Sequence, residues 1–180
     1  MSIESLLEAA RGSPRDAGRV ELIVVRLPGE GRATPPEARL SVDGGLDGDR
    51  WVLDSGADPA KQVSLINSRV LDVLAAPGRG RELAGDNLVV DLDLHEENLP
   101  PGARLRVGAA AIEVTAHPHQ SCSRFQRRYG QEANEAALGP AGLAQRLRGV
   151  YARVVRGGLV RVGDPIAVTS RPGRREARPR

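Results

Sequence analysis

The sequence predicts a mainly β domain, built as an antiparallel barrel with a few helices on its outside. Most patterned segments are short and rich in β-branched residues, and several flank glycines that are typical of hairpins. No regular alternation of strands and helices runs along the chain, which argues against a parallel α/β fold. The chain has 180 residues, enough for one domain with a proper core. Aromatic residues make up only 2% of it, so the core must be built from Val, Leu, Ile and Ala.

The first half of the chain predicts two helices and two strands. Apolar residues at helical spacing indicate a helix over residues 3–11, with Ser2 as its cap. Residues 19–27 and 61–66 are rich in β-branched residues and predict strands. Asn67 is placed to cap a second helix over residues 68–76, which Pro77-Gly78 ends.

The second half predicts more strands and two hairpins. Residues 87–92 are a strand candidate, and Gly108 indicates a hairpin between residues 104–107 and 111–115. Residues 131–148 are alanine-rich and predict a helix that breaks near Gly139-Pro140. Residues 150–168 alternate on both sides of Gly157-Gly158. We expect a second hairpin there, with both glycines at positive φ in a two-residue turn.

The predicted organisation is one domain with two short additions. Residues 1–17 form the first helix and a linker, residues 18–169 the domain, and residues 170–180 a tail. The tail holds five Arg and one Glu and no apolar stretch to pack, so we expect it to be disordered. The chain has 26 basic and 23 acidic residues in all, which leaves the domain itself near neutral. A solubilising overhang is favoured for the tail over a role in binding RNA or an acidic partner.

The location expected from the sequence is the cytoplasm. A single cysteine cannot form an internal disulfide, and neither an apolar signal segment nor a run long enough to cross a membrane is present. Trp51, Phe125, Tyr129 and Tyr151 are too few for a platform that stacks single-stranded nucleic acid. We therefore expect that the protein binds neither membranes nor nucleic acids, except for RNA if the tail binds it.

The most informative segment contains the only cysteine, in His-Pro-His-Gln-Ser-Cys-Ser-Arg-Phe-Gln-Arg-Arg at residues 117–128. Cys122 has polar neighbours and follows a strand that Pro118 ends, so a buried filler role is disfavoured. Nearby arginines would stabilise its thiolate and make it reactive. A zinc site of His117, His119 and Cys122 also stays open, although its fourth ligand would have to be His95 or a distant carboxylate.

Two other segments hold candidate binding residues. Arg50 either pairs with Asp47 or Asp49 on the surface or reaches an anionic ligand, which its planar guanidinium suits. Asn87 is either a turn residue or presents its amide to a site.

Several segments, taken in order, resemble the MOSC domain family, named after the C-terminal domain of molybdenum cofactor sulfurases. The resemblance covers roughly residues 18 to 168, and its order, spacing and lone cysteine make it specific. The matching segments are GLDGDRW (45–51), KQVSLIN (61–67), GDNLVVDLDL (85–94), LPPGARLRVGAAAIEVT (99–115), PHQSCSRF (118–125) and RLRGVYARVVRGGLVRVGDPI (146–166). Two departures are Ser121 before the cysteine, where many members have Pro or Gly, and Gly-Asp-Asn in place of Gly-Glu-Asn.

The resemblance implies a MOSC-type β-barrel, a small stand-alone member, and a link to the molybdenum cofactor, a pterin dithiolene that carries a phosphate. It implies that Cys122 is the catalytic residue and the molybdenum ligand, and that Arg50 and Asn87 bind the cofactor. Local reasoning adds further cofactor-binding candidates, namely Gln62, His119, Ser121 and Arg124. The cofactor, Mo-molybdopterin, is bound stably or transiently, and the chain has no pyridoxal-phosphate domain.

Three functions follow as hypotheses. The leading one is a reductase of N-hydroxylated compounds that works at a Cys122-ligated molybdenum and takes electrons from a separate redox protein. The second is a sulfur carrier that holds a persulfide on Cys122, with a cysteine desulfurase as its partner. The third is a zinc-bound or metal-free interaction module that uses the basic tail.

Overall fold

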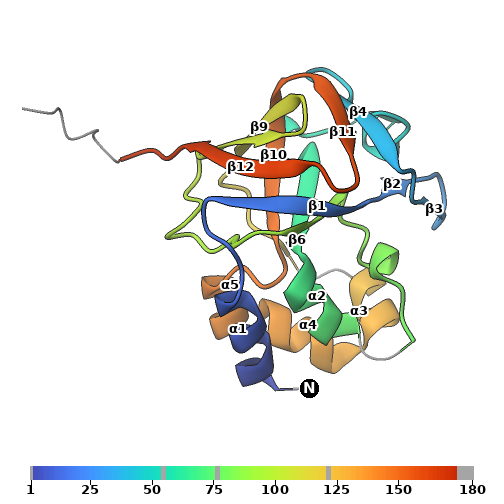
Figure 1. Ribbon diagram of the computed structural model, residues 1–180. Coiled ribbons are helices and arrows are strands. Elements are labelled where there is room, and N and C mark those ends of the chain that lie inside the picture. The colour runs from blue at the N-terminus through green and yellow to red at the C-terminus, as the bar shows by residue number, and fades with distance from the viewer. Residues whose placement is uncertain (1, 54–55, 76–77, 121–122, 174–180) are drawn as a thin grey trace, which may run out of the picture.

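The computed structural model describes residues 2–53, 56–75, 78–120 and 123–173, and within them seven strands close into a barrel (Figure 1). Around the barrel the strands are β1 (Ala17–Ile23), β12 (Pro165–Ser170), β8 (Arg104–Val107), β9 (Ala110–Val114), β10 (Val150–Arg156), β6 (Val63–Asn67) and β7 (Leu88–Asp91). Neighbouring strands are antiparallel except β6 and β7, which run parallel because α2 (Ser68–Ala75) lies in the connection between them. The predicted barrel-like fold class is confirmed.

Short strands extend one end of the barrel. A small sheet has the order β11 (Gly158–Arg161), β4 (Glu37–Ser41) and β5 (Gly45–Leu46). β2 (Val25–Arg26) and β3 (Arg32–Ala33) pair only with each other, and residues 27–31 form the exposed tip between them. This β2–β3 hairpin projects from the body on the right of Figure 1.

The helices gather beneath the barrel in Figure 1. Besides α2 they are α1 (Ile3–Arg11), α3 (Ser123–Tyr129), α4 (Gln131–Leu138) and α5 (Pro140–Ala144). The predicted caps are present, because Ser2 Oγ accepts from the Ser5 amide at 3.2 Å and Asn67 Oδ1 from the Val70 amide at 3.0 Å. The predicted break near Gly139-Pro140 separates α4 from α5. Among the described residues, no helix combines the length and apolar surface needed to cross a membrane.

Two clusters of buried side chains form the core. The cluster inside the barrel consists of Val, Leu, Ile and Ala alone, as the aromatic-poor composition predicted. The second cluster lies between the barrel and the helices and includes Leu6 of α1, Phe125 and Tyr129. Because β6 faces the first cluster on one side and the second on the other, all five of its residues are buried.

The hairpin predicted around Gly157-Gly158 is wrong. β10 pairs with β6 and β9, whereas β11 leaves the barrel and pairs with β4. Neither glycine has a positive φ. A Cβ on Gly158 would lie 2.4 Å from the carbonyl carbon of Ala109, so the glycine is needed for close backbone contact. The hairpin predicted around Gly108 is confirmed, with φ of 54° at that glycine.

The two ends of the chain are joined to the body more closely than predicted. Leu6 of α1 is fully buried, and β1 of the barrel begins at Ala17. Ser170 is still part of β12, and the Arg171 guanidinium donates to the carbonyl of Asn98 at 2.7 Å and pairs with Asp16. The body therefore extends past residue 169, and residues 174–180 of the predicted tail lie outside the described residues.

Candidate functional site

Six arginines line one cavity of about 180 Å³, called here the arginine cavity. It lies between α3, the β2–β3 hairpin and the segment that follows β9. Its lining residues are Arg26, Arg32, Arg50, Ser64, Ala84, Gly85, Asp86, His119, Gln120, Arg124, Phe125, Arg128, Arg148 and Tyr151. Asp86 balances only one of these charges, through an ion pair of 2.6 Å to Arg148. Asp49 pairs with Arg26, and Glu30 is shared by Arg124 and Arg128, so six arginines face three carboxylates and the cavity keeps an excess of positive charge that suits an anion.

The arginine cavity adjoins two wider hollows, together called the outer basin. Their volumes are about 430 and 410 Å³, within the range of small-molecule sites. Both contain Lys61, Arg124 and Tyr151. The other lining residues are Arg26, Pro28, Arg50, Trp51, Leu53, His117, Pro118, Gln120 and Ser123. The basin thus combines cations with aromatic and apolar walls.

The direction of Arg26 is determined by a buried carboxylate. Asp49 is 1% exposed, and it accepts from Arg26 Nη2 at 2.8 Å and from the Arg26 amide at 2.8 Å. Burial opposes ionisation of Asp49, but its hydrogen bonds with Arg26 and the positive charge of that residue outweigh it and lower its pKa. Asn87 Nδ2 donates to the same carboxylate at 2.9 Å. Asp49 therefore contributes to the cavity by orienting the Arg26 guanidinium in its wall.

Arg32 carries an uncompensated charge in the cavity wall. Burial, and after it the positive charges of Arg128, Arg50, Arg26 and Arg124, together lower its pKa to about 10. Its Nε is buried and makes no hydrogen bond with any residue that the structure describes. A bound anion would pair with this nitrogen and relieve the repulsion between the arginines.

Arg148 and His119 form the inner wall. The Arg148 guanidinium lies 4.5 Å from the centre of the Phe125 ring, and its buried Nε has no hydrogen-bond partner. The His119 ring stacks on Tyr151 with 4.0 Å between centroids. Burial, and after it the positive charge of Arg148, lowers the pKa of His119 to about 4, so the ring is neutral at pH 7. Its buried Nε2 also makes no hydrogen bond.

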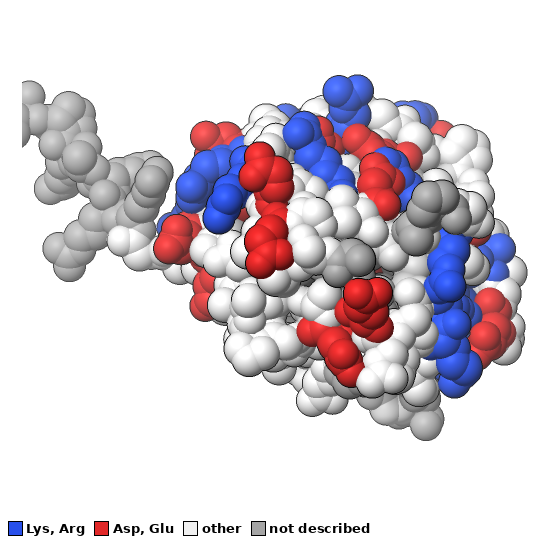
Figure 2. All heavy atoms as spheres, turned by 90° about the horizontal axis from the view of Figure 1, so that it is seen from below, with Lys and Arg blue, Asp and Glu red and all other residues white. Residues whose placement is uncertain are grey.

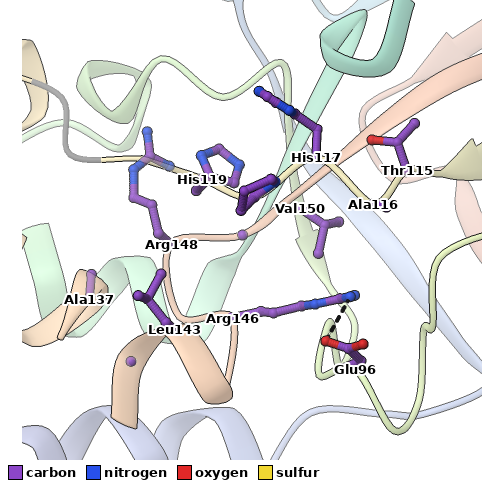
Figure 3. A pocket seen from close by; sticks show the side chains of 13 residues that line it. Glu96, Thr115, Ala116, His117, His119, Ala137, Leu143, Arg146, Arg148 and Val150 are labelled. Atoms are coloured by element: carbon purple, nitrogen blue, oxygen red, sulfur yellow. Dashed lines mark ion pairs between the residues drawn. The ribbon is translucent and has the colours of Figure 1, made fainter. Parts of the chain in front are cut away.

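A separate pocket of about 240 Å³ lies on the other side of the 115–119 segment (Figure 3). Its walls are largely apolar, with Val150, Ala137 and Leu143 among them. In Figure 3 Arg146 extends across it to Glu96, with which it forms an ion pair of 3.2 Å. His119 and Arg148 line both this pocket and the arginine cavity, so they form the wall between the two.

The structure brings together some of the sequence-predicted residues. Arg50, His119 and Arg124 all line the arginine cavity. Arg50 pairs with neither Asp47 nor Asp49 there. Its Nη1 donates instead to the carbonyl of Gly29 at 3.0 Å.

Gln62 and Asn87 lie outside the linings of the cavity and basin. The Gln62 amide donates to the Val42 carbonyl at 2.7 Å and accepts from the Val154 amide at 2.7 Å. Asn87 is fully buried, and its side-chain oxygen accepts from the Ser64 amide at 3.1 Å. Their geometry is that of residues that hold strands together and orient Asp49.

Ser121 and Cys122 lie outside the described residues. On either side of them in the sequence, Gln120 and Ser123 both line the outer basin, and Gln120 also lines the arginine cavity. Among the described residues, no group of three or more His, Cys, Asp and Glu is arranged to hold a metal ion. The proposed zinc set includes Cys122 and therefore stays a hypothesis.

Sequence reasoning missed Arg26, Arg32 and Arg148. Arginine is exposed by default in soluble proteins, and nothing local marks these three as exceptions. Arg26 ends strand β2, and Arg148 directly precedes Gly149 and Val150, which only the structure shows to be buried. Figure 2 shows Lys and Arg gathered in a band at the right-hand edge of the helical side.

Comparison with known proteins assigns the chain to a family. The family model described as the MOSC domain matches residues 46–167. The fold is similar to that of the YuaD protein from Bacillus subtilis, with a TM-score of 0.62, 19% identity, and coverage of 84% of this chain and 95% of that one. It is also similar to YiiM from Geobacillus stearothermophilus, with a TM-score of 0.61, 20% identity and coverage of 86% and 76%. YiiM from Escherichia coli has a TM-score of 0.57, 21% identity and coverage of 85% and 70%.

The comparison with curated protein sequences gave no match. The structural similarities, at identities near 20%, establish the fold. Since the family model covers more than half of the sequence, the chain belongs to the MOSC domain family, whose domains are associated in general with the molybdenum cofactor and sulfur chemistry.

Proposed function

We propose that the protein binds the molybdenum cofactor in the arginine cavity, with Cys122 as the metal ligand, and reduces N-hydroxylated compounds. The observation that carries the proposal is the convergence of six arginines beside the segment that leads to Cys122. Two of them, Arg32 and Arg148, have buried Nε atoms without a hydrogen-bond partner in the described part of the chain. Buried donors of this kind are costly unless a ligand completes them, so they support an anionic ligand as the occupant.

The donor set fits the anionic part of the cofactor. Arg32 and Arg148 would hold its phosphate, since each has a free Nε and a guanidinium suited to paired hydrogen bonds with oxygen. The Arg26 guanidinium, whose orientation is fixed by its ion pair with Asp49, would add positive charge near the phosphate. These residues bind and orient the group without taking part in electron transfer.

His119 fits the polar ring of the pterin. The imidazole is neutral at pH 7, so it does not add to the repulsion among the arginines. Its buried Nε2 has no partner and would exchange a hydrogen bond with a ring heteroatom. The stacking of His119 on Tyr151 restrains the ring orientation.

The reaction needs a thiolate and an outside source of electrons. The arginines near the segment around Cys122 favour the thiolate, which is the form that binds a soft metal centre. The bound cofactor would supply a metal that exchanges electrons with the substrate. Cleavage of the N–O bond consumes a pair of electrons and a pair of protons and releases water, so we propose a separate redox protein as the electron donor. The outer basin, with Trp51 and Leu53 in its walls, would receive the substrate.

A second candidate is a sulfur carrier that receives a persulfide on Cys122 from a cysteine desulfurase. The proximity of Arg124 to this segment in the outer basin favours it, because positive charge also stabilises an anionic persulfide. In such a carrier the arginines would stabilise the persulfide by their positive charge and would not need to bind a phosphate.

Metal analysis tests the first candidate. The protein is produced in a host that makes the molybdenum cofactor, beside Cys122→Ala, Arg32→Gln and the control Arg161→Gln. Arg161 is exposed on β11 and pairs with Glu37 at 2.9 Å, away from the cavity. We expect molybdenum in the original protein and the control, none in Cys122→Ala and less in Arg32→Gln. Full molybdenum content and full reductase activity in Cys122→Ala would disprove the assignment.

Mass spectrometry separates the two candidates. A carrier would contain no stable molybdenum and would gain about 32 Da on Cys122 after incubation with a desulfurase and cysteine. Zinc, if present in the original protein and absent from Cys122→Ala, would support the zinc-bound module instead.

A further inference from the structure

The β2–β3 hairpin lies against the arginines that line the cavity. Its exposed tip carries Glu30, whose carboxylate lies 2.9 Å from Arg127, 3.2 Å from Arg128 and 3.8 Å from Arg124. Two of these partners, Arg124 and Arg128, also line the arginine cavity. One surface carboxylate thus draws on the same donors that the cavity offers to a ligand.

The backbone of the hairpin occupies two more of these arginines. Arg50 Nη1 donates to the Gly29 carbonyl at 3.0 Å, and Arg32 Nη1 donates to the Gly31 carbonyl at 2.8 Å. Three of the six cavity arginines, Arg124, Arg128 and Arg50, therefore hold the tip from outside the hairpin, whereas Arg32 lies at the base of the hairpin in β3. A bound anion would compete with the tip for these three.

The tip of the hairpin, residues 27–31, is weakly attached, whereas its base is anchored by the buried Val25 and by the pairing of Arg26 with Asp49. β2 and β3 contribute two residues each and pair only with one another. Residues 27–31 are all exposed, and Gly29 has a φ of 73°. The contacts of the tip with the body are mainly those of the exposed Glu30 carboxylate and the Gly29 carbonyl, and exposed charge pairs each contribute little free energy in water. Such an element opens locally at low cost.

We propose that the tip of the β2–β3 hairpin, residues 27–31, is a lid on the arginine cavity, and that Glu30 holds it in place as an internal anion that the ligand displaces. The lid rests on the proposed function only in requiring that the cavity binds an anion. Glu30 thereby sets the affinity of the site, since a ligand must overcome its ion pairs, and it restricts the cavity to ligands with enough charge to do so. The lowered pKa of Glu30, caused by its hydrogen bonds with Arg127 and Arg128, keeps this carboxylate ionised at neutral pH.

Calorimetric titration with inorganic pyrophosphate at low ionic strength tests the lid. The variants are Glu30→Gln and the control Glu37→Gln. Glu37 is a similarly exposed glutamate that pairs with Arg161 away from the cavity. We expect Glu30→Gln to bind pyrophosphate about threefold to tenfold more tightly, and the control to match the original protein. Unchanged or weaker binding by Glu30→Gln would overturn the proposal, as would the absence of binding to every variant.

Hydrogen exchange distinguishes a moving lid from a simple effect of charge. We expect saturating pyrophosphate to accelerate amide exchange in a peptide that covers residues 25–33. Tighter binding by Glu30→Gln without faster exchange would show that Glu30 acts through its charge alone, and the lid would be rejected. Arg32→Gln should weaken binding, which places the pyrophosphate in the cavity, and undiminished binding there would also reject it. Because pyrophosphate is the probe, the result is independent of whether molybdenum is bound.

Discussion

The buried carboxylate of Asp49 offers the most direct test of how the site is built. Asp49→Asn keeps the shape of the side chain but removes the charge that Arg26 pairs with. The Arg26 side chain is 16% exposed and lies beside the other arginines of the cavity, so the loss leaves it nearly buried and uncompensated. We expect the variant to be less stable, with Arg26 displaced.

The magnitude follows from the geometry of the pair. Removing one partner of a buried ion pair costs about 3–5 kcal/mol. Arg26 keeps some access to water and Asn keeps one acceptor, so we expect a loss of about 2–4 kcal/mol in the free energy of unfolding. Since small proteins are typically stable by about 5–15 kcal/mol, this is a large fraction.

Urea denaturation of the original protein, Asp49→Asn and the control Glu37→Gln measures the effect. The exposed control should lose less than about 1 kcal/mol. Because the pKa of Asp49 is lowered in the folded protein, its contribution is fully present above the unfolded value of about 3.9 and is lost as the pH falls below it. The difference between the original protein and Asp49→Asn should therefore shrink in acid. A loss at pH 7 no larger than that of the control would refute this reasoning.

Three further variants test other contacts. The pKa of His119 is about 4 in the folded protein and about 6.5 in the unfolded chain, so the folded state favours the neutral ring. The free energy of unfolding should therefore fall by up to about 3 kcal/mol as the pH drops from 6.5 to 4. His119→Gln should reduce that loss in urea titrations at pH 7 and 4.5, and an unchanged pH dependence would contradict it. Gly158→Ala should cost about 1–3 kcal/mol, because the new Cβ would meet the Ala109 backbone, and thermal unfolding would detect it. Gln62→Leu leaves two backbone groups without partners and should cost about 2–4 kcal/mol. Undiminished thermal stability of this variant would return Gln62 to the set of ligand-binding candidates.

The fold was largely predictable because its elements have local causes. Asn67 caps α2 with its own side chain, and Gly108 adopts the positive φ of its hairpin. The pairing of β11 was not predictable. Alternation along residues 150–168 indicates strands, but it does not say which neighbour each strand meets. The glycines at 157 and 158 permit a close backbone crossing as readily as a turn.

The candidate site was predictable in part. The basic segment around Cys122 led to Arg124 and His119, and the family resemblance led to Arg50. Asn87 and Gln62 have amides that bind a ligand and a backbone equally well, so only the structure could show their partners. The lowered pKa of His119 depends on burial by residues distant in the sequence.

The sequence by itself determined the barrel class, most of the strands and helices, and the family. These depend on local patterns and on ordered segments, which a single chain displays directly. Only the tertiary structure decided that arginines from positions 26 to 148 converge on one cavity, and that Glu30 competes for them. The physical reason is that a cluster of like charges is unfavourable in any short segment, and it exists only where a fold holds distant residues together and supplies carboxylates such as Asp49 and Asp86 to offset the repulsion.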